Sequence, residues 1–117
     1  MFEKDMRLVV LLDCYGELLG EHRRSIMELY YCEDFSLAEI AENTGISRQA
    51  VRESIKKSET ELHAFEEKLH LAERLPALRA YCADAAARIE RAAVLVPNEN
   101  DRAALRDTAA FLRAAPL

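Results

Sequence analysis

The fold is decided by residues 36–57, which read SLAEIAENTGISRQAVRESIKK. Ser36 and Glu39 have the spacing of a capping box, in which the serine oxygen accepts a backbone N–H of the first helical turn and the glutamate accepts the backbone N–H of the cap residue. Gly45 can adopt the positive φ with which helices commonly end. Ser47 then has the residue type and place of a second helix cap. The stretch therefore predicts two helices joined by a tight turn.

These two predicted helices carry the small and apolar residues that a helix-turn-helix requires. Ala41 is the small residue where the helices would cross, and Gly45 is the turn residue four positions later. Apolar anchors stand on both sides of the turn at Ile40, Ile46 and Val51. A plain corner of two helices without a nucleic-acid role would satisfy the same steric rules, so this alternative stays open here.

The second helix of the motif also carries side chains of the kinds that contact DNA. The candidate DNA-binding residues, which project away from Val51 and Ile55, are Ser47, Arg48, Gln49, Arg52 and Lys56. Arg and Gln make paired hydrogen bonds to guanine and adenine edges, whereas Ser and Lys suit phosphates. Glu53 would repel phosphate unless it accepts from a cytosine or pairs with Lys57. This face favours a DNA-binding motif over a plain corner.

The remainder of the chain has helical periodicity. Apolar residues recur at helical spacing over 4–19 and 21–32, and again over 77–96 and 101–114. Three glycines and three prolines are too few for the turns of a sheet protein. We expect an all-α protein with a helix-turn-helix domain over residues 1–75. Residues 76–117 are expected to form a helical hairpin that packs on the same core or on a dimer partner.

The helix that follows Ser47 has no predicted break before Pro76. An apolar row along it has the alternating spacing of a seam against another helix. The predicted dimer seam consists of Ile55, Leu62, Phe65 and Leu69. The short helices before the motif do not suffice to cover this row, so we expect a homodimer that presents two recognition helices to successive major grooves. Cover by the C-terminal hairpin of the same chain is the alternative.

Charge and targeting signals bear on the partners. The net charge of −5 argues against strong non-specific affinity for nucleic acid, although basic residues cluster between positions 48 and 57. The N-terminus lacks a basic region followed by an apolar run, and no long apolar stretch occurs, which predicts a cytoplasmic protein without a membrane partner. Cys14, Cys32 and Cys82 lack C-x-x-C spacing and are expected to be buried reduced thiols.

The sequence offers little for catalysis or metal binding. His63 and His70 are seven residues apart, and neither a cysteine nor a carboxylate completes a metal site at ligand spacing. The carboxylate pairs at 13 and 17 and at 66 and 67 fall on polar helix faces without a nucleophile motif. We therefore expect no catalytic residue, no metal, no cofactor and no enzymatic activity.

A family resemblance rests on two stretches, EHRRSIMELYYCEDFSLAEIA at 21–41 and GISRQAV at 45–51. They resemble region four of bacterial sigma factors and, more closely, the YlxM family of short bacterial proteins. The similarity continues through IKKSE at 55–59 and EEKL at 66–69. Two departures are Gly20, where the family tends to have a threonine cap, and the alanine-rich C-terminal part.

The resemblance implies a helix-turn-helix DNA-binding regulatory protein. It also implies a link to the signal recognition particle pathway, which rests on the position of the family's genes. Two alternatives remain open: an adaptor that binds protein or RNA components of that pathway, and an accessory protein of RNA polymerase. The acidic total charge favours the adaptor, whereas the Arg48, Gln49 and Arg52 face favours DNA.

Overall fold

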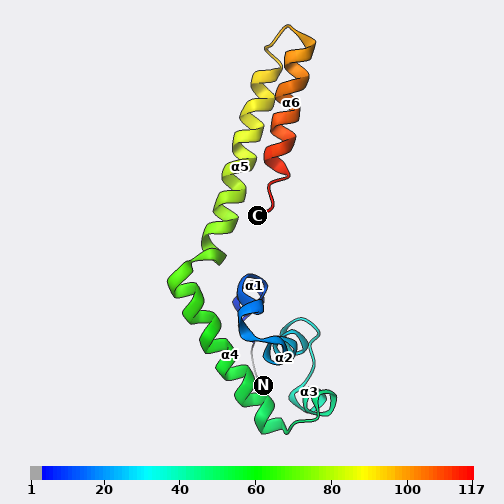
Figure 1. Ribbon diagram of the computed structural model, residues 1–117, viewed down its shortest axis with the longest axis vertical. Helices are drawn as coiled ribbons and strands as arrows, with labels where there is room; N and C mark the ends of the chain where they lie inside the picture. The colour runs from blue at the N-terminus through cyan, green and yellow to red at the C-terminus, as the bar shows by residue number, and fades with distance from the viewer. Residues whose placement is uncertain (1–3) are drawn as a thin grey trace. The chain divides into compact units, whose positions relative to one another are not determined.

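The computed structural model describes residues 4–117, which contain six α-helices and no strand (Figure 1). The elements are α1 (Arg7–Tyr15), the 3-10 helix η1 (Gly16–Leu19), α2 (Glu21–Tyr31), α3 (Leu37–Thr44), α4 (Arg48–Leu69), α5 (Leu71–Ala93) and α6 (Glu99–Arg113). The predicted all-α class is confirmed. The chain divides into two compact units, Met1–Ala72 and Glu73–Leu117, whereas the sequence placed the boundary after residue 75.

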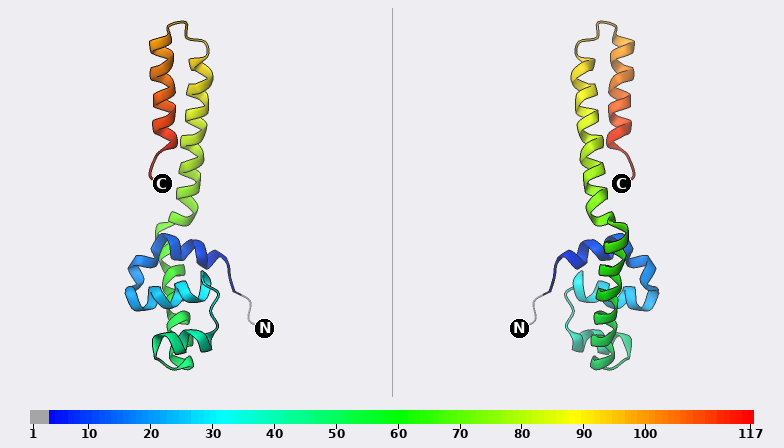
Figure 2. Two further views of the ribbon diagram at one scale, coloured as in Figure 1. Left: turned by 90° about the vertical axis from the view of Figure 1, so that its right-hand side faces the viewer. Right: turned by 90° about the vertical axis from the view of Figure 1, so that its left-hand side faces the viewer.

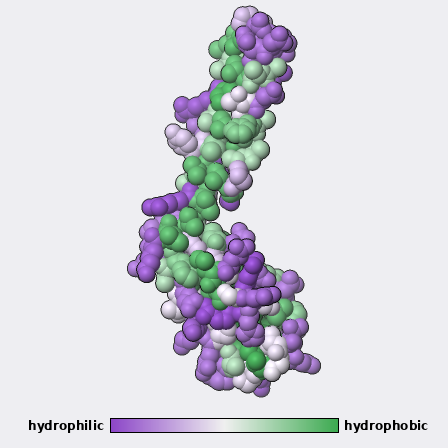
Figure 3. Space-filling model, viewed as in Figure 1, coloured by the Kyte–Doolittle hydropathy of each residue, from purple (hydrophilic) through white to green (hydrophobic). Residues whose placement is uncertain are grey.

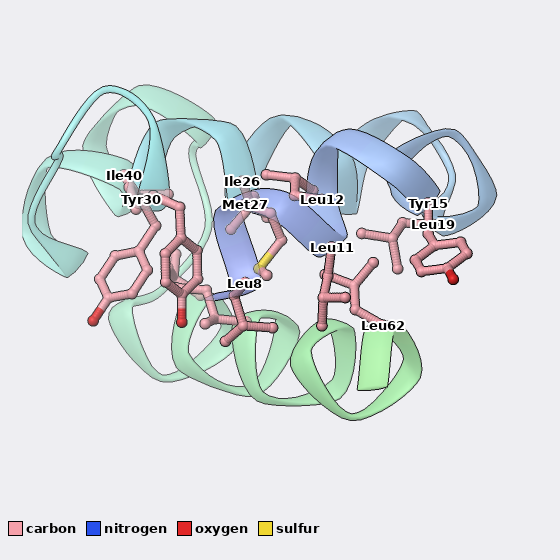
Figure 4. Close-up of a cluster of buried hydrophobic side chains, with 13 residues drawn as sticks. Leu8, Leu11, Leu12, Tyr15, Leu19, Ile26, Met27, Tyr30, Ile40 and Leu62 are labelled. Carbon is pink, nitrogen blue, oxygen red and sulfur yellow. The ribbon is translucent and has the colours of Figure 1, made fainter. Parts of the chain in front are cut away.

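The first unit is built around α4, on which α1, α2 and α3 all pack (Figure 2). Its core is a single cluster of large apolar side chains (Figure 4). The buried members are Leu8, Leu11, Leu12, Tyr15, Leu19, Ile26, Met27, Tyr30, Tyr31, Ile40, Val51, Ile55 and Leu62. Burying one such side chain stabilises a fold by about 1.5–3 kcal/mol, so this cluster fixes the position of α4.

Local signals set the helix ends in this unit as the sequence predicts. The capping box is complete, because Ser36 Oγ accepts from the Glu39 N–H and the Glu39 carboxylate accepts from the Ser36 N–H, both at 3.1 Å. Gly45 adopts a left-handed conformation with φ of 76° and ends α3. Ser47 Oγ caps α4 by accepting from the Ala50 N–H at 3.0 Å. The two helices of the motif are therefore joined by a turn held at both ends.

The predicted seam along α4 is largely the core of the first unit. Leu62 is fully buried, Ile55 is 5% exposed, and Phe65 packs beside Tyr15 with ring centroids 5.8 Å apart. Only Leu69, at 45% exposed, is left uncovered. The expectation that the helices before the motif cannot cover this row is wrong for Ile55, Leu62 and Phe65, because α1 and α2 both lie along α4. The row therefore gives no support to a homodimer.

The expected helix from Ser47 to Pro76 is also wrong, because it is broken at His70. His70 has φ of 55° and ends α4, and Pro76 lies inside α5. Tyr15 of α1 stabilises this break. Its hydroxyl donates to Glu66 Oε1 at 2.6 Å and accepts from the Leu71 N–H at 2.9 Å. Glu66 Oε1 also accepts from the Ala72 N–H at 3.0 Å. Two free N–H groups at the start of α5 are thus satisfied.

The second unit is a hairpin in which α5 and α6 lie side by side and antiparallel (Figures 1 and 2). The side chains fully buried in it are alanines, namely Ala86, Ala93 and Ala109. Asn98 caps α6 by accepting the N–H groups of Asn100 and Asp101. Arg113 of α6 forms an ion pair with Glu90 of α5. The predicted C-terminal helical extension is therefore present.

The cysteines differ partly from expectation. All three are reduced thiols that form no disulfide within residues 4–117, as expected. Cys14 and Cys82 are half-buried, but Cys32 is exposed because it follows the last turn of α2 as its C-terminal cap. The expectation of a buried thiol is wrong at Cys32, since helical periodicity no longer determines burial once the helix has ended.

Candidate nucleic-acid interface

The helix-turn-helix geometry is formed by α3, the turn at Gly45 and the first half of α4. Ile40 and Val51, one from each helix, are fully buried in the core of the first unit, and Ala41 and Ile46 are half-buried. Because Ile40 and Val51 point inward, the opposite side of α4 faces solvent. The motif thus holds the start of α4 firmly while leaving one side of it free for a partner.

All five predicted DNA-binding residues are exposed at the surface of this unit: Ser47, Arg48, Gln49, Arg52 and Lys56. Three of them, Arg48, Arg52 and Lys56, follow one another at four-residue spacing and form a row along α4. Within residues 4–117 these three side chains make no hydrogen bond or ion pair. Their charges are therefore available to an anion.

The remaining polar residues of the site are already engaged. Gln49 Nε2 donates to Glu53 Oε1 at 3.1 Å, which leaves Glu53 paired with Gln49. Ser47 serves as the helix cap through its hydroxyl oxygen, so only its O–H remains to donate. An adenine contact from Gln49 would require this side chain to leave Glu53.

The surroundings of the basic row are acidic. Helix α3 carries Glu39 and Glu42 at exposed positions and no basic residue. Glu39 is held in the capping box, whereas Glu42 faces solvent close to the turn. Carboxylates near a phosphate backbone lower affinity through repulsion. The site therefore depends on three cations and lacks the broad basic surface of a non-specific binder.

Polar contacts that the sequence did not suggest tie α4 to α2. Arg23 forms an ion pair with Glu61, and the Tyr31 hydroxyl donates to Glu59. Arg23 holds the pKa of Glu61 below its usual range, and burial raises the pKa of Tyr31. Both pairs join residues far apart in sequence, for which periodicity within one helix gives no signal. Together these two contacts fix the position of α4 relative to α2.

The family follows from comparison with known proteins. A family model with the description "Putative helix-turn-helix protein, YlxM / p13 like", UPF0122, matches residues 2–93. The chain belongs to the UPF0122 family. This membership confirms the resemblance to the YlxM family and agrees with the helix-turn-helix formed by α3 and α4.

Individual UPF0122 relatives match a shorter stretch. The UPF0122 protein of Clostridium kluyveri is 54% identical over 71 residues, which cover 61% of this chain and 64% of that protein. The UPF0122 protein of Oceanobacillus iheyensis is 51% identical over 71 residues, covering 61% of this chain and 68% of that protein. A UPF0122 protein of Streptococcus agalactiae is 49% identical over 69 residues, which cover 59% of this chain and 63% of that protein. The chain thus spans less than two thirds of the Clostridium relative.

No helix within residues 4–117 combines the length and the apolar composition needed to cross a bilayer.

Proposed function

We propose that this UPF0122 protein binds double-stranded DNA through α4 and acts as a regulatory protein without enzymatic activity. The observation that carries the proposal is the row of Arg48, Arg52 and Lys56, three exposed cations without an ion pair within residues 4–117. The row lies on the second helix of a helix-turn-helix, which is the element that enters the major groove in this class. Its position is fixed by the core beneath it.

Each residue of the site has a role in this proposal. Arg48 and Arg52 donate in pairs to guanine edges, and Gln49 reads adenine once it has left Glu53. Lys56 binds phosphate, and the Ser47 hydroxyl donates to phosphate at the start of the helix. Because few cations take part, we expect low affinity for random DNA and a strong dependence on salt concentration.

The cellular role is proposed from the family resemblance. We propose that the protein regulates transcription in the cytoplasm and that its helix-turn-helix resembles that of sigma region four. We also propose a link to the signal recognition particle pathway. A homodimer remains a prediction, and the buried seam residues Ile55 and Leu62 lend it no support.

A second candidate function is an adaptor that binds a basic protein. The observation that favours it is a groove of about 560 Å³ between α1 and α2, away from the basic row. Its lining combines Val9 and Val10 with the carboxylates of Asp13, Glu17 and Glu28, against a single cation, Arg24. Arg24 is already paired with Glu28 at 3.0 Å. Such a surface suits a basic apolar partner better than a nucleic acid.

Duplex binding measured at two salt concentrations tests the DNA proposal. We expect Arg48→Ala and Arg52→Ala each to weaken binding by about 1–3 kcal/mol for a duplex selected from a random pool, with the fold intact by circular dichroism. Arg91→Ala is the matched control, because Arg91 is an exposed arginine on α5 outside the motif. The parent should lose affinity with a slope of about −0.9 per phosphate contact. Unchanged binding by both variants would reject the DNA proposal and favour the adaptor.

A further inference from the structure

A pocket lies beside the basic row, between α2, α3 and α4. Its volume is about 310 Å³, and it is lined by Tyr30, Leu37, Arg52, Ile55, Lys56 and Glu59. Tyr30 and Ile55 belong to the buried core, Leu37 is half-buried, and Arg52 and Lys56 are exposed at the rim. The pocket thus has an apolar base and two cations at its mouth.

The apolar base is held in place by contacts on several sides. The Tyr30 ring stands edge-on to the Tyr31 ring at 5.0 Å between centroids. Lys4 Nζ lies 4.2 Å from the Tyr30 ring centroid and donates to the Tyr30 carbonyl oxygen at 2.6 Å. Lys4 is itself paired with Asp34 at 2.8 Å. A base restrained in this way is preformed, which lowers the cost of ordering side chains when a ligand binds.

The charge at the mouth determines the class of ligand. Arg52 and Lys56 make no hydrogen bond or ion pair within residues 4–117. Glu59, the acidic residue of the lining, accepts a hydrogen bond from the Tyr31 hydroxyl. Two free cations therefore face one carboxylate that is already engaged, and an anionic group is the complementary ligand.

We propose that this pocket binds a small carboxylate with an aryl or alkyl chain. The aryl or alkyl group of the ligand packs against Tyr30, Leu37 and Ile55, and its carboxylate pairs with Arg52 and Lys56. The volume is at the lower end of the range of ligand pockets, which limits the ligand to a compact molecule. Because the same two cations belong to the proposed DNA face, the bound carboxylate competes with DNA. This last step alone rests on the proposed function.

The test is a titration of the full chain with 4-phenylbutyrate and with octanoate, followed by amide shifts in ¹H–¹⁵N NMR spectra. We expect saturable shifts at the amides of Tyr30, Leu37 and Ile55, and at least tenfold weaker binding of the neutral analogue 4-phenylbutanol. Lys56→Ala should weaken carboxylate binding about five- to tenfold. Arg48→Ala is the matched control, since Arg48 continues the row but does not line the pocket.

The proposed carboxylate binding would be overturned by the absence of saturable shifts at these amides with both carboxylates at millimolar concentration, or by equal binding of 4-phenylbutanol. Shifts confined to the hairpin would overturn it as well. The competition is tested separately by DNA affinity at saturating carboxylate, where unchanged affinity would reject it. If duplex binding itself fails, the NMR titration still decides whether the pocket takes a carboxylate, so the two failures are distinguishable.

Discussion

The two units bury their apolar residues differently. In the first unit, large side chains such as Ile26, Met27 and Leu62 have no exposed surface. In the hairpin, the fully buried side chains are alanines, and large apolar residues lie at the surface. These exposed residues include Leu78, Tyr81, Val94, Leu95 and Phe111. Figure 3 shows this apolar surface over the hairpin, whereas more of the first unit is hydrophilic in the same view.

This difference indicates that the first unit is stabilised mainly by side-chain packing and the hairpin mainly by local helix stability. Interlocked side chains of the first unit hold α4 rigidly, which a site made of three side chains in a row requires. The hairpin depends more on alanine propensity, on the Asn98 cap and on pairs such as Arg88 with Asp84. This chain therefore offers a partner two kinds of surface: a rigid one on the first unit and an exposed apolar one on the hairpin.

The largest effect is expected from truncation of Leu62. Leu62→Ala should lower the free energy of unfolding of the first unit by about 2–5 kcal/mol, because the side chain is fully buried. The matched change Leu78→Ala, at a residue 46% exposed, should cost less than about 1 kcal/mol. Urea denaturation followed by circular dichroism measures both. Similar losses from the two variants would show that the units are packed alike.

Because Leu62 is fully buried, a charged residue in its place is expected to unfold the first unit. Such a variant therefore cannot test whether the protein is a dimer. The homodimer prediction has to be examined at exposed positions, by light scattering of the parent and of a Leu69→Glu variant. Leu69 is the one residue of the predicted seam that is classed as exposed.

Sequence predicted those features of the fold that a few neighbouring residues determine. The capping box, the turn at Gly45 and the cap at Ser47 each depend on contacts within four residues, and all three are present. Periodicity likewise gave the exposed row on α4, since it identifies which side of a helix is polar.

Features set by distant residues could not be predicted in this way. Periodicity showed that Ile55 and Leu62 share a face, but not that α1 and α2 cover it. Pro76 predicts the end of the helix because proline lacks an N–H, yet the helix ends earlier, at His70, where Tyr15 and Glu66 satisfy the start of α5. The pocket between α2, α3 and α4 also arises only from tertiary packing.

A smaller effect is expected where a single hydroxyl fixes the break after α4. Tyr15→Phe leaves the Leu71 N–H without its acceptor and removes one of the hydrogen bonds to Glu66, which should cost about 1–3 kcal/mol. Hydrogen exchange of the Leu71 and Ala72 amides should accelerate. Tyr81→Phe on the hairpin is the control, because Tyr81 is largely exposed, and it should change neither quantity. Unaltered exchange in Tyr15→Phe would mean that the local sequence alone sets the break.

The helix caps allow a comparison at about 1 kcal/mol. Ser36→Ala and Asn98→Ala each remove a side-chain acceptor at the start of a helix, with an expected loss of about 1 kcal/mol. Exchange of amides at the start of α6 should accelerate strongly in Asn98→Ala, since few large side chains hold that helix. In Ser36→Ala the packing of Ile40 should keep α3 formed. Asn98→Asp and Ser36→Thr retain an acceptor and serve as controls.

The smallest effect concerns acid and the ion pair between α2 and α4. The hydrogen bond from Arg23 lowers the pKa of Glu61 from its ordinary value of 4.5, and burial opposes this only partly. A carboxylate with a lowered pKa in the folded state stabilises the fold above its unfolded pKa, and this contribution is lost as the pH falls through the folded pKa. Glu61→Gln should therefore be less stable than the parent at about pH 6, and the difference should be smaller at about pH 3. Denaturation curves at both pH values measure this. A constant difference at the two pH values would show that Glu61 acts through packing and that its charge contributes nothing to the hold of α2 on α4.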